Sequence, residues 1–168
     1  MNRRNCPCPI CPIGIPGPEG PPGSLIISVG TFYSTSLSQI PYNSPVPVAS
    51  GMRTAGSGIS LISAADILLD NIGVYLVSYY IQGDPIGGIE TIACSLKLNN
   101  VTVPGSIVQS VTTTLSYSSE PAVSNTCIIE VTTPGSILQL FNSSNSGLTH
   151  VVWVENFCSA SITVLRLS

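Results

Sequence analysis

Three cysteines near the N-terminus are the residues whose type and spacing first suggest chemistry. Cys6, Cys8 and Cys11 form a Cys-x-Cys-x-x-Cys pattern. A tetrahedral zinc site needs about four nitrogen or sulfur ligands, and the single histidine, His150, is far away in the sequence. Cys8 and Cys11 also have the Cys-x-x-Cys spacing of redox-active sites, but no predicted helix follows them whose N-terminus could lower a thiol pKa. We therefore predict no metal and no cofactor here, and we favour disulfides between molecules, with free thiols as the simplest alternative.

The other three cysteines, Cys94, Cys127 and Cys158, lie in the rest of the chain. Equal numbers in the two parts allow pairing between molecules. Cys94 and Cys127 alternate with apolar residues, so we expect them to be small, buried hydrophobic residues. Cys158 falls in a short connection between two predicted strands, where a thiol can be reached. We expect the N-terminal cysteines to pair with Cys158, and Cys94 or Cys127 are less favoured partners.

Residues suited to catalysis are scarce. The chain has one histidine, no Gly-x-Ser-x-Gly motif and no loop that concentrates the six or more oxygens that calcium needs. Its carboxylates are scattered over the chain, as Asp66, Asp70, Asp84, Glu90, Glu120, Glu130 and Glu155. We therefore predict that the protein is not an enzyme.

Three tyrosines in one predicted strand, Tyr75, Tyr79 and Tyr80, allow two interpretations. Exposed aromatic rings can form a platform for a sugar. Aromatic residues of a strand more often belong to a core or a subunit interface, which is the interpretation we favour.

The composition limits the classes of partner. Only 8% of the residues are charged, the net charge is -3, and 43% are hydrophobic, which excludes a disordered chain and disfavours nucleic acid. The mean hydropathy is high, at +0.44, but no window reaches the roughly 18 apolar residues of a membrane span. The N-terminal residues also lack the apolar run of a signal peptide. We expect synthesis in the cytosol and close packing against copies of the same chain.

Residues 1–23 form a segment rich in proline and glycine, which we predict to be an extended arm. Gly14, Gly17, Gly20 and Gly23 recur at every third position, as a collagen triple helix requires. A triple helix this short needs a trimeric domain beside it. The alternative is an unpaired polyproline linker.

Residues 24–168 are predicted to form one all-β domain, because short runs of β-branched and aromatic residues alternate with turn residues. The number and spacing of the strands favour a sandwich or jelly roll. The segment 64–69 is compatible with either a helical turn or a strand. We expect strands over residues 25–32, 46–49, 58–63, 73–81, 91–98, 107–115, 126–131, 137–142, 150–155 and 161–167.

A near-repeat contains two Pro-Gly-Ser-Ile sequences, which start at Pro104 and Pro134. Proline presets the first turn angle, and the following glycine supplies a positive φ. Each copy therefore predicts a hairpin.

The order of these features resembles the collagen-like surface proteins of Bacillus-group spores, which belong to the outermost spore layer, the exosporium. The resemblance rests on the Gly-X-Y arm, the strand 73–81, the two Pro-Gly-Ser-Ile turns and the closing segment 159–168. It implies a trimeric jelly-roll head like those of TNF and the complement globular heads. First and last strands would then be antiparallel neighbours, and Cys158 would lie at the pole opposite the arm.

The short collagen stretch and the N-terminal cysteines depart from the spore-surface glycoproteins. They resemble instead the endospore appendage subunits, whose cysteine-bearing connectors link one subunit to the next. This resemblance implies a structural protein of the spore surface, made in the mother-cell cytosol, whose trimers stack head to tail by disulfides. Its expected partners are itself, an anchoring protein and a tip protein. The alternative is the trimeric head of a spore or phage fibre that binds carbohydrate or a receptor.

Overall fold

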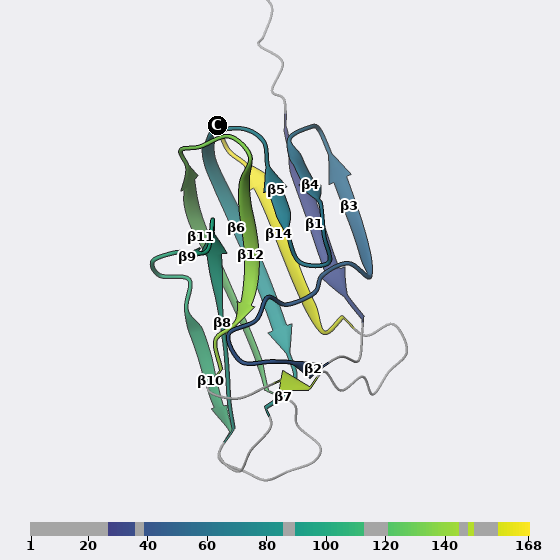
Figure 1. Cartoon of the computed structure of the whole chain (residues 1–168), viewed down its shortest axis with the longest axis vertical. Coiled ribbons are helices and arrows are strands. Elements are labelled where there is room, and N and C mark those ends of the chain that lie inside the picture. The colour runs from purple at the N-terminus through teal and green to yellow at the C-terminus, as the bar shows by residue number, and fades with distance from the viewer. Residues whose placement is uncertain (1–26, 36–38, 86–89, 113–120, 145–147, 150–157) are drawn as a thin grey trace, which may run out of the picture.

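The computed structural model describes residues 27–35, 39–85, 90–112, 121–144, 148–149 and 158–168 (Figure 1). All elements within these ranges are strands, as expected for an all-β domain. Among the described residues, no helix is long and apolar enough to cross a membrane. Three predictions lie outside the described residues: the N-terminal arm with its glycine triplets, the boundary between residues 23 and 24, and the strand 150–155.

Three antiparallel sheets make up the described structure, and Figure 1 shows the two larger ones face to face. The five-stranded sheet has the order β11-β6-β14-β1-β3, from strands β1 (Val29–Ser34), β3 (Gly51–Ala55), β6 (Gly73–Gln82), β11 (Ala122–Val131) and β14 (Ala160–Arg166). The six-stranded sheet has the order β10-β8-β12-β5-β4, with β9 (Val101–Thr102) beside β8, from β4 (Ile59–Leu61), β5 (Ile67–Leu69), β8 (Glu90–Leu98), β10 (Val108–Thr112) and β12 (Ser136–Asn142). A small third sheet joins β2 (Gln39–Ile40), β13 (Leu148–Thr149) and β7 (Asp84–Pro85).

In the five-stranded sheet, the strand that comes first in the chain, β1, and the strand that comes last, β14, are antiparallel neighbours, as expected. Val29 is opposite Leu165, and Ser34 is opposite Ala160. The start of β1 and the end of the chain therefore share one end of the sandwich, at the top of Figure 1. Cys158, just before β14, lies at the other end.

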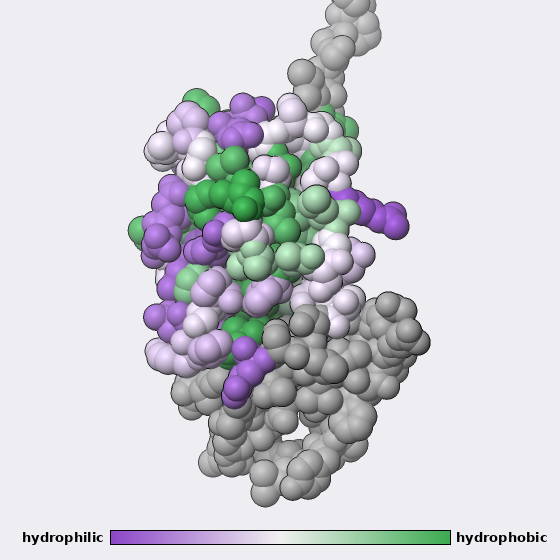
Figure 2. Space-filling view, turned by 45° about the vertical axis from the view of Figure 1, so that its right-hand side comes forward, coloured by the Kyte–Doolittle hydropathy of each residue, from purple (hydrophilic) through white to green (hydrophobic). Residues whose placement is uncertain are grey.

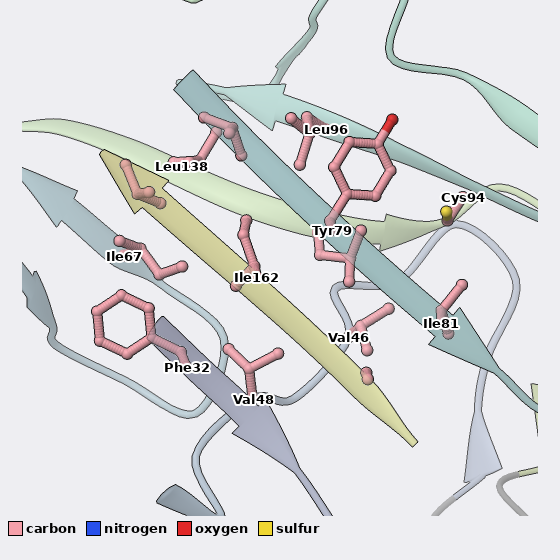
Figure 3. Close-up of a cluster of buried hydrophobic side chains, with 14 of the residues drawn as sticks. Phe32, Val46, Val48, Ile67, Tyr79, Ile81, Cys94, Leu96, Leu138 and Ile162 are labelled. Carbon is pink, nitrogen blue, oxygen red and sulfur yellow. The ribbon is translucent and has the colours of Figure 1, made fainter. Parts of the chain in front are cut away.

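Alternation along the strands produces the core between the sheets. Along β6, Tyr75, Val77, Tyr79 and Ile81 are buried, and the residues between them are only partly buried. Side chains at every second position of a strand point to the same face. Both sheets contribute to the cluster in Figure 3, for example through Ile162 of β14 and Leu138 of β12.

The two predicted hairpins are wrong, although both Pro-Gly turns are present. Gly105 and Gly135 have φ values of 75° and 74°. However, β9 and β10 both pair with β8, and β11 and β12 belong to different sheets. A turn reverses the chain without requiring that its flanking strands pair.

The hairpin in this region is formed by Asn99 and Asn100, which connect β8 to β9. Both residues have positive φ values, of 50° and 65°. This left-handed conformation matches the twist of paired strands and is tolerated by asparagine. Sequence analysis did not identify this turn.

Several segments differ from the strand boundaries expected from sequence; for example, β11 begins at Ala122 and not at residue 126. Residues 46–49 form no regular strand, although Val46 and Val48 are buried and donate backbone hydrogen bonds to Leu140 and Ala64. The edge strand β3 was not predicted, because its side chains are mostly exposed and do not alternate. Segment 64–69, left open above, ends in strand β5 and contains no helical turn.

The serine that follows each Pro-Gly pair stabilises the turn by a hydrogen bond from its hydroxyl to a carbonyl within the turn. The Ser106 hydroxyl donates to the Val103 carbonyl at 2.7 Å, and the Ser136 hydroxyl donates to the Thr133 carbonyl at 2.6 Å. Ser106 is fully buried and also accepts a hydrogen bond from the Leu96 amide of β8. The near-repeat is therefore repeated in three dimensions as a turn with an internal hydrogen bond.

Replacing Ser106 with alanine is expected to destabilise the protein, because the buried Leu96 amide loses its hydroxyl acceptor. An unsatisfied buried donor costs about 1–3 kcal/mol. Urea unfolding at fixed protein concentration measures the change, and Ser57→Ala, at an exposed serine, is the matched control. Equal loss of stability in the two variants would contradict this role of Ser106.

Candidate functional site

The outward face of the five-stranded sheet carries its side chains in rows across the strands. One row is aliphatic and consists of Ile128, Leu76, Leu165 and Val29. Register pairing places these residues next to one another on β11, β6, β14 and β1. We call this set the aliphatic row.

The adjoining row consists of hydroxyl side chains, and we call it the hydroxyl row. Thr126 and Ser78 are 2.8 Å apart through their hydroxyl oxygens, and Thr31 and Thr163 are 3.0 Å apart. Within each pair, the two hydroxyl groups form a hydrogen bond between adjacent strands. The row is therefore polar but uncharged and held in a fixed arrangement.

Charge is confined to the two margins of this face. Arg53 lies on the edge strand β3, and Glu130 lies on the edge strand β11. The outward positions of β1, β6 and β14 carry no charged residue. A face with this composition loses little charge hydration when another protein surface covers it.

A second apolar surface adjoins the aliphatic row at Ile128 and lies along the open edge of the sandwich, where β10 and β11 each have a single strand partner in their sheets. Four large hydrophobic residues are exposed there, and we call them the edge patch: Val101 at 70%, Ile107 at 62%, Val111 at 52% and Ile128 at 64%. Between β9 and β11, Val101, Pro104 and Ile128 also line a hollow of about 340 Å³. Figure 2 shows the molecule turned so that the side of β3 comes forward. On this side too, green hydrophobic surface lies among purple polar residues.

Two of the three described cysteines point into the sandwich. Cys94 on β8 is fully buried, which confirms the expectation, and burial raises its pKa to about 12. Cys127 on β11 packs against the core but is partly exposed, and its thiol pKa is also raised by burial. Neither is in a disulfide within the described residues.

Cys158 lies at the end of the sandwich opposite the chain termini. Its neighbour Ser159 donates a backbone hydrogen bond to Ser34 at the end of β1. The thiol is partly buried and donates to the Ala160 carbonyl at 3.3 Å. Burial raises its pKa, and hydrogen bonds with Ser161 and Ala160 oppose that rise. Cys158 is therefore a partly exposed thiol at that end of the sandwich, while Cys6, Cys8 and Cys11 lie outside the described residues.

The tyrosines of β6 do not form a common platform. Tyr75 and Tyr79 are buried, and their hydroxyls donate to the carbonyls of Asn71 and Ser106. Burial raises the pKa of Tyr79 to about 12. Tyr80 points to the other face. The core interpretation is confirmed for Tyr75 and Tyr79.

The described residues form no cluster that resembles a metal site. Among the described residues, no group of three or more histidine, cysteine, aspartate or glutamate side chains could hold a metal ion. His150 and Glu155 lie outside the described residues. The two surfaces above, which sequence analysis did not locate, are the candidate contact surfaces for other copies of this chain.

Comparison with solved structures shows the fold. The chain is similar to the Eiger TNF of S. frugiperda, with a TM-score of 0.57 and 16% identity over 85% of this chain and 92% of that chain. It is also similar to murine APRIL, with a TM-score of 0.54 and 12% identity over 84% of this chain and 99% of that chain. No protein-family model and no curated protein sequence matches. The fold is therefore a TNF-like jelly roll, as the sequence resemblance implied.

The placement of the thiols predicts an order of reactivity. In a Cys6/Cys8/Cys11→Ser variant, iodoacetamide is expected to modify Cys158 in the native protein and Cys94 only after unfolding. Because burial raises the Cys158 pKa, its thiolate fraction is small at neutral pH and grows as pH rises, so labelling accelerates with pH. Mass spectrometry of peptides, with and without urea, measures this order. Labelling of Cys94 as fast as Cys158 in the folded protein would contradict it.

Proposed function

We propose that this protein is a structural subunit of a self-assembling spore-surface fibre, built from trimers and without catalytic activity. The observation that carries the proposal is the pair of exposed apolar surfaces: the outward face with its aliphatic row, and the edge patch. The TNF-like fold supports a trimeric head, and a Gly-X-Y arm that forms a triple helix would also need three chains.

A ring of three copies needs two different surfaces that fit each other, because each subunit contacts its neighbours in a head-to-tail manner. The edge patch presents Val101 and Ile128, which line one hollow between β9 and β11, and the outward face presents Leu76 and Leu165. Contact between these surfaces covers apolar side chains on both copies. Burial of apolar surface contributes roughly 25 cal/mol per Å², so the edge patch of one copy stabilises the face of the next.

Ile128→Asp is expected to weaken the trimer, since it places a carboxylate on a side chain that is 64% exposed at this contact. Ile62→Asp is the matched control, because Ile62 is similarly exposed, at 55%, but follows β4 outside both surfaces. Sedimentation of the full-length variants at micromolar concentration measures the change. We expect smaller species for Ile128→Asp only, and a monomeric parent protein would contradict the trimer.

Stacking of trimers into a fibre is the second step of the proposal. The arm would leave at the end of the sandwich where β1 begins, and Cys158 lies at the opposite end. An arm that reaches the next trimer could therefore meet a thiol there. Disulfides are stable outside a reducing cytosol, so the joint would become covalent after the mother cell lyses. An anchoring protein and a tip protein complete the proposed fibre.

Mutation of Cys6, Cys8 and Cys11 to serine is expected to leave trimers intact but to make the filaments fragile. Each disulfide typically adds about 2–4 kcal/mol where it constrains a chain, and several joints in parallel must all break. Electron microscopy after heating in detergent without reductant measures survival. Cys158→Ser tests the head partner in the same assay, and Cys94→Ser is its control. Filaments of the triple variant that survive as well as the parent would show that packing alone holds the arm.

A further inference from the structure

We propose that a hollow on the outer face of the six-stranded sheet binds a neutral saccharide. The hollow has a volume of about 350 Å³ and is lined by Asp66, Asn99, Asn100, Ile137 and Gln139. This size is at the lower end of the roughly 300–1,000 Å³ found for small-molecule sites. It belongs to neither of the surfaces assigned above to contact between copies.

Three segments that are distant in sequence meet at this hollow. Gln139 and Ile137 project from β12, Asp66 immediately precedes β5, and Asn99 and Asn100 form the hairpin after β8. Pairing of β12 with both β5 and β8 brings them together. The hollow is therefore built on the sheet, and the positions of its polar groups are set by strand register.

Hydrogen bonds fix most of the lining side chains before any ligand arrives. Gln139 Nε2 donates to Asp66 Oδ1, and the Ser63 hydroxyl donates to Asp66 Oδ2 at 2.7 Å. Asn99 Oδ1 accepts from the Ile137 amide at 2.8 Å, and Asn99 Nδ2 donates to the Ser136 hydroxyl at 3.1 Å. Side chains held in this way lose little further conformational entropy on binding.

The groups that remain for a ligand are both donors and acceptors. The Asn100 carboxamide is exposed, and the Asp66 and Gln139 oxygens keep lone pairs beyond the bonds above. Sugar hydroxyls also donate and accept, so adjacent hydroxyls can bond to a carboxylate and an amide side by side. The aliphatic side chain of Ile137 offers contact to the C–H face of a sugar ring.

The charges around the hollow favour a neutral ligand. Asp66 is the single acidic residue among its lining groups, which is too few oxygens of that kind for a calcium site, and its negative charge opposes phosphate or sialic acid. The nearest strand partner of Gln139 is Lys97, whose ammonium is 3.1 Å from Asn43 Oδ1 and 3.6 Å from the centre of the Phe141 ring. These contacts keep the Lys97 ammonium beside Asn43 and Phe141, which do not line the hollow.

The site lies on the six-stranded sheet and therefore faces away from the outward face of the five-stranded sheet, and its lining residues are not those of the edge patch. If the trimer forms as proposed, each trimer presents three such sites, and linked sites raise apparent affinity for a clustered glycan by about 10²–10⁴. Binding at a single hollow does not depend on assembly.

The test uses the full-length protein on an array of neutral and sialylated oligosaccharides, followed by titration of the strongest neutral ligand. Asn100→Gly removes the carboxamide and keeps the positive φ that glycine tolerates. Gln139→Met removes the amide and keeps the size of the side chain. Gln109→Met makes the same change on β10, on the same outer face but outside the hollow, and is the matched control.

We expect a neutral glycan to bind, with affinity at least tenfold lower in Asn100→Gly and Gln139→Met and unchanged in Gln109→Met, while circular dichroism and sedimentation match the parent. No glycan bound, only sialylated glycans bound, or equal binding by all variants would overturn the proposal. Filaments that bind no glycan would overturn this inference alone, and glycan-binding protein that never forms trimers or filaments would overturn the proposed function alone.

Discussion

The insertion of β14 between β1 and β6 is the pairing on which the rest of the structure depends. It joins the last strand of the chain to the first and completes the five-stranded sheet. Its inward residues, Ala160, Ile162 and Val164, are fully buried. Its outward residues complete the aliphatic and hydroxyl rows. The core and the candidate self-association face therefore form together, through pairing of distant parts of the sequence, which makes folding slow compared with folds built from local contacts.

Contacts between the two sheets depend on a polar link as well as on hydrophobic packing. The buried Tyr79 hydroxyl of β6 donates to the Ser106 carbonyl in the turn before β10, and the side chain of Asn125 contacts both the Tyr79 hydroxyl and the Gly105 carbonyl. A turn on one sheet is thus attached to strands of the other. The edge patch lies beside this link, so its exposed side chains are held on a fixed backbone.

The positions of strands and buried residues could be predicted from the residue pattern. The strand partners could not be predicted in this way. Runs of β-branched and aromatic residues over 73–81 and 91–98 identified β6 and most of β8, and the inward position of Cys94 followed from its alternation with apolar residues. The Pro104 and Pro134 turns were identified, but their strand partners were not, because pairing is set by the whole sheet. The two surfaces and the hollow combine residues from strands distant in sequence, so no local motif marks them. The Asn99-Asn100 hairpin did carry a signal, since two consecutive asparagines suit a positive φ.

The hydroxyl row affects how a contact made through the outward face would respond to salt and pH. Hydroxyl groups do not ionise in the ordinary range of acidity, and their mutual hydrogen bonds are not weakened by dissolved salt as contacts between opposite charges are. The centre of the outward face, on β6 and β14, holds such groups beside aliphatic ones. Contact between copies through this centre would therefore vary little with ionic strength or acidity.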